Sequence, residues 1–279
     1  MKYSVTVYSF NQYIKAGKMT FFETIAKAKE LGFDGIEFTN AAFDSAEDPI
    51  AVAKELRAEA DRVGLPVSNL AVGADLLQPD GVEKVCKYVD IAEILGAPTL
   101  RHDVAKAFPN PTWKGYDNVL EQLADACRRI TEYAAAKGIR TMTENHGYFS
   151  QDSLRVEKLI NTVAHENFGQ LVDMGNFLCA DEDPVTAVGR CAPYAFYVHA
   201  KDFFIRSGML PNPGEGFLTT RGGNFIRGTI VGQGNVPVPQ CLRALKRVGY
   251  DGWLSVEFEG MEDCIKGIEI GLKNLKSYE

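Results

Sequence analysis

The sequence lacks the features that mark membrane-bound or nucleic-acid-binding proteins. None of its stretches approaches the roughly 18 consecutive apolar residues that a membrane-spanning helix needs. Its 30 basic residues are outnumbered by 37 acidic ones, whereas a protein that binds the phosphate backbone carries a basic stripe. The first residues, Met1–Val7, read as a strand and not as a secretory signal. We therefore expect neither nucleic acid nor a membrane among the partners.

Cysteine and histidine are both scarce. The six cysteines are scattered and form no CxxC pair, and most lie in helix-like stretches, where cysteine behaves as a small buried apolar residue. We expect free thiols and a cytoplasmic location, because disulfides rarely persist in a reducing compartment. The chain has only four histidines, which limits the number of histidine-rich metal sites that it can build.

What the sequence does contain is a regular alternation of strand-like and helix-like segments. The first strand is expected over residues 4–10, and helices are expected over 20–31, 48–63, 79–95, 116–137, 153–164, 184–191, 238–248 and 261–276. Glycines at 32, 64, 96, 138 and 249 separate helices from the strands that follow. Eight strand–helix units in 279 residues predict an α/β fold. Specifically, they predict a single (β/α)₈ TIM barrel of parallel strands with outer helices, spanning residues 1–279 as one domain.

One connection is longer than the rest. Residues 203–237 follow the seventh expected strand and are rich in glycine and proline. Because most connections take only a handful of residues, a long one is usually functional or disordered. A loop that covers the substrate is the preferred interpretation, and an oligomer contact is the alternative.

Four of the expected strands end in a residue that can bind a metal ion. Glu144, Asp173, His199 and Glu257 lie at or near these ends, at the edge of a barrel where catalytic residues collect. The first three are 29 and 26 residues apart, close to the roughly 30 residues of one strand–helix repeat. They are therefore expected on adjacent strands five, six and seven, with Glu257 on strand eight.

Three carboxylates and one imidazole in one place suit a divalent cation. Without a cation the carboxylates would repel one another strongly. The donor set favours Mn²⁺, with Mg²⁺, Co²⁺ or Zn²⁺ as alternatives. Taken singly, each residue could equally be a solvated strand end, but the four together predict one metal site.

Other polar residues near these ends are candidates to bind a sugar hydroxyl, a carbonyl or a phosphate. They are His102, His146, Asn176, Lys201 and Arg227. For the two histidines the alternative is a hydrogen-bonded structural imidazole, and for Lys201 and Arg227 it is a surface salt bridge. Glu37 and Glu259 are weaker candidates, for which a solvated or supporting role is favoured.

Several motifs resemble those of the xylose isomerase-like barrels. They are Gly32–Phe38, Thr143–His146, Val172–Asn176, Val198–Phe203, and Gly232–Val236 followed by Tyr250–Glu257. The resemblance covers nearly the whole chain, and that superfamily includes sugar isomerases, ketose 3-epimerases, inosose dehydratases and apurinic endonucleases. It implies that the four strand-end residues form the family's single metal site. In the epimerase branch, the residues matching Glu144 and Glu257 also move protons on opposite faces of the substrate.

The chain departs from the family in two ways. Asn176 stands where the epimerases and endonucleases often have histidine. The four histidines, His102, His146, His165 and His199, are too few for the endonuclease's additional zinc sites. A nuclease activity is therefore disfavoured.

The expected activity is that of a metal-dependent sugar isomerase or epimerase. It would act on a ketose, a ketose phosphate or a related polyol ketone by proton transfer through a metal-bound ene-diolate, with Glu144 and Glu257 as the catalytic pair. An inosose-type dehydratase with the same metal site is the main alternative. A non-catalytic sugar-binding barrel would be a different class of protein. The resemblance also makes pairing into a homo-oligomer plausible.

Overall fold

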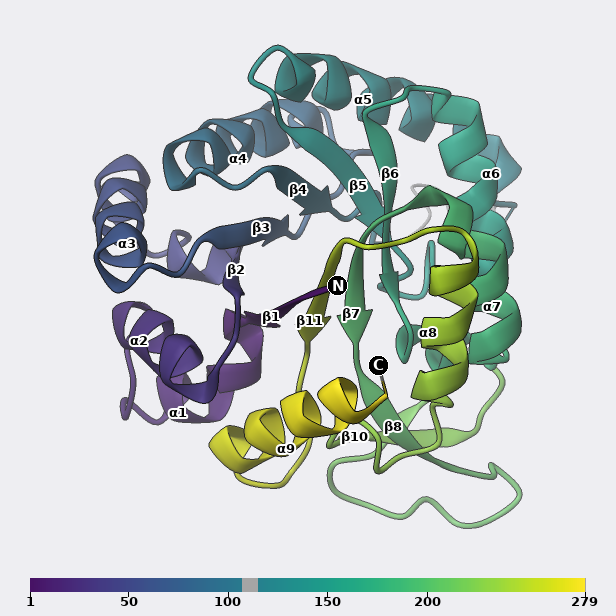
Figure 1. The fold of residues 1–279 in the computed structure, drawn as a ribbon. Coiled ribbons are helices and arrows are strands. Elements are labelled where there is room, and N and C mark those ends of the chain that lie inside the picture. Colours follow the sequence, from purple (N-terminus) through teal and green to yellow (C-terminus); the bar gives the residue numbers. More distant parts are fainter. Residues whose placement is uncertain (107–114, 279) are drawn as a thin grey trace.

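Eight parallel strands close into a barrel in this computed structural model, which describes residues 1–106 and 115–278 (Figure 1). The order around the barrel is β1-β11-β7-β6-β5-β4-β3-β2, and the two ends of that series, β1 and β2, pair with each other. The strands are β1 (Lys2–Thr6), β2 (Gly35–Thr39), β3 (Val67–Val72), β4 (Thr99–His102), β5 (Arg140–Glu144), β6 (Phe168–Asp173), β7 (Ala195–Ala200) and β11 (Trp253–Val256). The predicted TIM barrel is confirmed.

Helices surround the barrel, as Figure 1 shows. They are α1 (Asn11–Lys15), α2 (Phe21–Leu31), α3 (Pro49–Val63), α4 (Gly81–Leu95), α5 (Asp117–Ala135), α6 (Ser153–Val163), α7 (Pro184–Cys191), α8 (Val238–Arg247) and α9 (Cys264–Ser277). Thr20 caps α2 through a reciprocal capping box with Glu23, as the sequence predicts. The five separating glycines all have positive φ, the left-handed conformation that ends a helix without a Cβ clash.

The barrel has an inner and an outer core. The larger apolar core fills the space between strands and helices. Inside the barrel, Met142, Leu171 and Tyr197 form a separate cluster. Since side chains alternate between the two faces of a strand, the residues two positions further along these strands, Glu144, Asp173 and His199, also face the interior. The inner cluster thus forms an apolar layer next to the polar residues at the carboxyl ends of these strands.

Two segments differ from the expectation. The first strand ends at Thr6 and not at Phe10, because the Thr6 hydroxyl accepts a hydrogen bond from the Tyr8 amide and starts a 3₁₀ helix over Val7–Phe10. The long segment 203–237 contains a small antiparallel sheet between its irregular stretches. In this sheet β10 (Phe225–Thr229) lies between β8 (Asp202–Arg206) and β9 (Leu218–Thr219).

All six cysteines are free, as expected. Within residues 1–106 and 115–278, no helix is both long and apolar enough to cross a membrane.

Candidate metal centre

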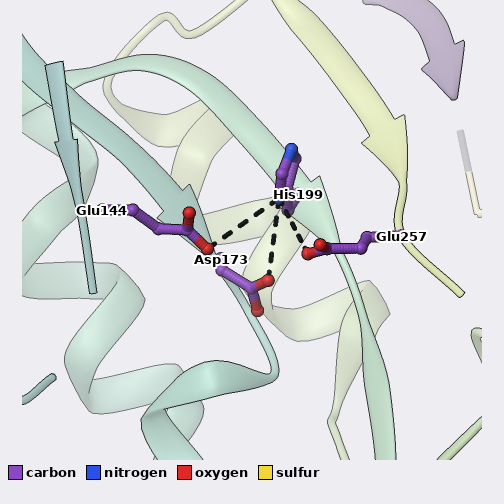
Figure 2. A group of neighbouring side chains, drawn as sticks. All are labelled: Glu144, Asp173, His199 and Glu257. Atoms are coloured by element: carbon purple, nitrogen blue, oxygen red, sulfur yellow. Dashed lines mark ion pairs between the residues drawn. The ribbon is translucent and has the colours of Figure 1, made fainter. Parts of the chain in front are cut away.

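The four strand-end residues converge inside the barrel mouth (Figure 2). Glu144 and Asp173 are the last residues of β5 and β6, His199 is the fifth of the six residues of β7, and Glu257 directly follows β11. One ligand atom from each side chain lies within 4.8 Å of those from the other three. The site therefore brings together all four predicted metal ligands, although the first and the last of them, Glu144 and Glu257, are 113 residues apart in the sequence.

Three of these side chains direct a buried atom toward the centre of the site: Asp173 Oδ2, His199 Nδ1 and Glu257 Oε2. His199 Nδ1 lies 2.9 Å from Glu257 Oε2 and 3.8 Å from Asp173 Oδ2, so the three atoms face one another as ion pairs. The other oxygen of Asp173 accepts hydrogen bonds from the amides of Gly175 and Asn176 at 2.7 and 2.8 Å. These amides fix the carboxylate so that Oδ2 faces His199 Nδ1. Three carboxylates and one imidazole whose ligand atoms converge on one buried point fit a bound cation, which would offset the repulsion among the carboxylates. The oxygen-rich donor set suits Mn²⁺ or Mg²⁺ and is compatible with Zn²⁺ or Co²⁺.

The protonation states of the metal-free site also indicate a cation-binding role. Burial raises the pKa of Asp173 to about 7. Burial opposes protonation of His199, but the negative charges of Glu37 and Glu257 outweigh it and raise the imidazole pKa well above its usual range. Burial also opposes ionisation of Glu257, but Lys201 and His199 hold its pKa well below the usual range. In the metal-free site, the protonated imidazole thus supplies the positive charge that a bound metal ion would otherwise supply.

Glu37, the middle residue of β2, orients the histidine. Its side chain is completely buried, and its two oxygens lie 2.9 and 3.0 Å from His199 Nε2. When Nε2–H donates to this carboxylate, the lone pair of Nδ1 is left to bind the metal. From the sequence, Glu37 was expected to have only a solvated or supporting role. The available signal was a single carboxylate inside an otherwise apolar strand, at a position whose parity faces the interior.

Lys201 and Asn176 lie beneath the ligands. The Lys201 ammonium is 2.9 Å from Glu257, 3.5 Å from Asp173 and 3.3 Å from Glu259. The Asn176 side chain donates to Glu144 Oε1 at 3.0 Å and accepts from Lys201 at 3.2 Å. Both side chains are buried, and neither lines the adjoining cavity. Their contacts are to the ligands, which they hold in place.

Strand β4 contributes Arg101, which the sequence analysis did not select. The guanidinium is buried, with Nε 2.6 Å from Glu144 and Nη2 2.8 Å from Asp103. Asp103 in turn contacts His146 Nδ1 at 2.9 Å. His146 therefore lies at the barrel mouth, on the same side as Glu144, as predicted.

His102 does not reach the cavity that adjoins the ligands. Its ring packs 6.0 Å from Phe168, and Nδ1 is hydrogen-bonded to the Asp103 carbonyl. Burial lowers its pKa to about 4. Because neighbouring strand residues face opposite sides, His102 points toward the helices while Arg101 points inward. Its contacts are those of the structural imidazole that the sequence left as the alternative.

Arg227 also lies outside the cavity. It is on β10, with its guanidinium over the rings of Phe204 and Phe217 and 3.9 Å from Glu262. No residue of 203–237, all of which the structure describes, lines the cavity. The sheet is instead tied to neighbouring loops, where Asp181 accepts hydrogen bonds from Thr220 and Asn224. The geometry therefore does not support a lid role for this segment in the structure described.

The cavity above the ligands has a volume of about 360 Å³. Its lining is mainly polar and comprises Thr6, Tyr8, Glu37, Thr39, Asn40, Ala41, Ala71, Gly73, Arg101, Asp103, Glu144, His146, His199, Glu257 and Glu259. Ligand pockets typically span ~300–1,000 Å³. The cavity is thus of a size and polarity to take a small polyhydroxylated molecule next to the four ligands.

Comparison with known proteins adds a family. Residues 25–278 match the family described as xylose isomerase-like TIM barrel. The rhizopine catabolism protein MocC of Rhizobium meliloti is 32% identical over 150 residues, covering 53% of this chain and 43% of that protein. An inosose dehydratase of Lacticaseibacillus casei is 26% identical over 165 residues, covering 57% and 54%. The chain thus spans about half the length of the curated relatives it matches.

Solved structures share the same fold. A D-psicose 3-epimerase from Clostridium cellulolyticum H10, determined with D-tagatose, superposes with a TM-score of 0.76 over 100% of this chain and 99% of that one. Its sequence is only 15% identical, so this likeness establishes the barrel alone.

Proposed function

Because the chain belongs to the xylose isomerase-like TIM-barrel family, we propose that it is a metal-dependent enzyme. It moves protons at the carbon next to the carbonyl of a keto sugar or keto polyol. The observation that carries this proposal is the convergence of four metal-binding side chains, whose ligand atoms lie within 4.8 Å of one another, beside a cavity lined mainly by polar residues. The inosose dehydratases among its relatives and the epimerases among its structural neighbours are enzymes named for substrates of this kind.

Glu144, Asp173, His199 and Glu257 would hold one divalent cation, with Mn²⁺ favoured. When bound, such a cation polarises a substrate carbonyl and stabilises the negative charge that develops on its oxygen. Asp173 and His199 serve only as ligands, since the first is fixed by two backbone amides and the second by Glu37.

Glu144 and Glu257 are the proposed proton carriers. They come from β5 and β11, on either side of the adjacent β6 and β7, and Figure 2 shows them on opposite sides of Asp173 and His199. Both line the cavity. One carboxylate takes the proton from the carbon beside the carbonyl, and the other returns a proton from the opposite side. Lys201 beside Glu257 favours the ionised form that this carboxylate needs to act as a base, and Arg101 Nε lies 2.6 Å from the Glu144 carboxylate.

His146 is the proposed contact for a substrate hydroxyl, because it lines the cavity and Asp103 holds its ring. Lys201 and Asn176 act through the carboxylates that they contact. These assignments lead to an isomerase or epimerase. A dehydratase is the second candidate, favoured by the curated relatives that carry that name. In that reaction the same proton abstraction is followed by loss of a hydroxide from the next carbon.

The test is deuterium exchange from D₂O catalysed by the Mn²⁺-loaded protein. The panel is D-fructose, D-tagatose, D-psicose, fructose 6-phosphate, scyllo-inosose and methyl 3-keto-β-D-glucopyranoside. Exchange is followed by NMR and by ultraviolet absorbance, which detects a dehydrated enone. Wild type should exchange deuterium into at least one compound, and Glu144→Gln and Glu257→Gln should abolish that exchange. Glu269→Gln, which changes an exposed carboxylate on α9, is the control and should retain it. Exchange that persists in both active-site variants, or no exchange across the panel, would overturn the proposal.

A further inference from the structure

A second, larger cavity adjoins the cavity at the metal centre. The outer cavity holds about 570 Å³ and shares Asn40 and Gly73 with the inner cavity. Its lining is Asn40, Asp44, Pro49, Ile50, Gly73, Lys84, Lys87, Tyr88, Asp90 and Ile91. It therefore extends from the barrel mouth over the loop after β2 and along α3 and α4. The inner cavity accounts for the part of a substrate beside the four ligands, but not for this extension.

Hydrogen bonds hold the boundary between the two cavities. The Asn40 side-chain oxygen accepts from the Gly73 amide at 3.2 Å, which links the loop after β2 to the loop after β3. The Asn40 side-chain nitrogen and the Tyr88 hydroxyl both donate to Asp44. Asp44 thus connects the boundary residue Asn40 to the aromatic ring on α4. This arrangement preorganises the outer cavity together with the mouth of the inner one.

The outer cavity has apolar walls and no excess of positive charge. Pro49 and Ile50 open α3, and Ile91 of α4 lies opposite them in the same cavity. The lining holds two lysines and two aspartates. Lys84 is paired with Asp80 at 2.8 Å and Asp90 with Lys137 at 3.1 Å, which leaves Lys87 as a single exposed cation. A site for a phosphate would present a cluster of cations or converging donors, and not one lysine. The lining is instead suited to an uncharged apolar or aromatic group, which Tyr88 can contact through its ring.

We infer that the substrate is a glycoside: a keto sugar whose ring lies beside the four ligands and whose apolar or aromatic aglycone occupies the outer cavity. The inference rests on the proposed function for the sugar portion. Because the anomeric carbon of a glycoside is substituted, its carbonyl lies at another ring carbon, next to a hydrogen that Glu144 or Glu257 can remove. Free ketoses would leave the outer cavity unused.

Ile50 offers a way to alter the outer cavity without touching the metal centre. It is the second residue of α3 and is 37% exposed. Aspartate suits this position because acidic residues stabilise the first turn of a helix, so Ile50→Asp should fold. Ile50→Trp is a second variant, which fills the cavity. Leu154, the second residue of α6 and 61% exposed, lines neither cavity. Leu154→Asp and Leu154→Trp are therefore matched controls.

The probes are phenyl 3-keto-β-D-glucopyranoside and its methyl counterpart. Calorimetric titration of the Mn²⁺-loaded protein measures binding, and deuterium exchange is followed separately. Wild type and both Leu154 variants should bind the phenyl compound at least tenfold more tightly than the methyl compound. Both Ile50 variants should reduce that preference below threefold while leaving the methyl compound's affinity unchanged.

Equal affinity for the two compounds in wild type, or no binding of either, would overturn the inference. A preference that survives both Ile50 substitutions would do so too. Phenyl-selective binding without deuterium exchange would support the outer cavity's role and count against the proposed proton transfer. Exchange into free ketoses without phenyl selectivity would support the proposed proton transfer and contradict the role of the outer cavity.

Discussion

Replacing Glu37 by glutamine should weaken metal binding although Glu37 is not itself a ligand. Its carboxylate is fully buried and lies 2.9–3.0 Å from His199 Nε2. An amide oxygen can still accept the Nε2–H hydrogen bond, so the ring keeps its tautomer but loses the charge that raises its basicity. Loss of such a partner typically costs ~10–100-fold in metal affinity, or about 1.4–2.8 kcal/mol.

Calorimetric titration of Mn²⁺ into metal-free protein at pH 8 measures this loss, and circular dichroism checks the fold. The loss should shrink toward pH 6, because Glu37→Gln also weakens the hold on the proton that competes with the metal for His199. Asp34→Asn is the matched control. Asp34 immediately precedes β2 and accepts a hydrogen bond from the Tyr3 amide, far from the ligands along that strand, and its substitution should leave Mn²⁺ affinity unchanged. If Glu37→Gln binds Mn²⁺ within twofold of wild type, the reasoning fails, and packing against Tyr197, 5.9 Å away, suffices to orient the ring.

Three further predictions concern the surroundings of the ligands. Arg101→Met should destabilise the metal-free protein by about 3–5 kcal/mol in urea unfolding, because it leaves the buried carboxylate of Glu144 and the partly exposed one of Asp103 without their cation. Arg57→Met, which breaks an exposed pair with Asp61, should cost at most about 1 kcal/mol. Equal losses of stability in the two variants would contradict the claim that burial makes the Arg101 ion pairs more important. The affinity for Mn²⁺ should rise at least tenfold from pH 6 to pH 8, because burial places the pKa of Asp173 at about 7 and His199 holds a proton in the metal-free site. Metal binding must release these protons, and a flat pH profile would count against that competition. Asp181→Ala should speed tryptic cleavage after Arg221 severalfold without changing Mn²⁺ affinity, since Asp181 tethers Thr220 and Asn224. Asn212→Ala affects only a local turn and should not speed this cleavage. Equal cleavage rates in the two variants would show that contacts other than those of Asp181 hold the sheet in place.

The barrel and the convergence of the four candidate ligands could be predicted from the sequence because both depend on periodic, local signals. Capped helices ending in glycine alternate with short strands, and that rhythm fixes the number and order of the units. Glu144, Asp173 and His199 then follow from one rule, that functional groups collect at the carboxyl ends of barrel strands. Nothing beyond the spacing of one repeat is needed to place them on neighbouring strands.

Supporting residues were harder to predict because their roles depend on contacts across the barrel. Glu37 is 162 residues from His199 in the sequence, and no local pattern links them. On β4, a strand of four residues, the sequence indicated His102, whereas the structure places Arg101 beside Glu144. A shift of one position exchanges the two faces of a strand. Glycine and proline in 203–237 suggested a loop, although the alternating Phe225–Thr229 stretch pairs as a strand.

The central claim is that one divalent cation is held by Glu144, Asp173, His199 and Glu257. It is tested most directly by measuring bound Mn²⁺ per chain by mass spectrometry after reconstitution and gel filtration. Wild type should retain one Mn²⁺ per chain, and Asp173→Asn and His199→Gln should retain essentially none while keeping their circular dichroism spectra. A folded wild type that retains no divalent metal, or variants that retain a full equivalent, would contradict the account.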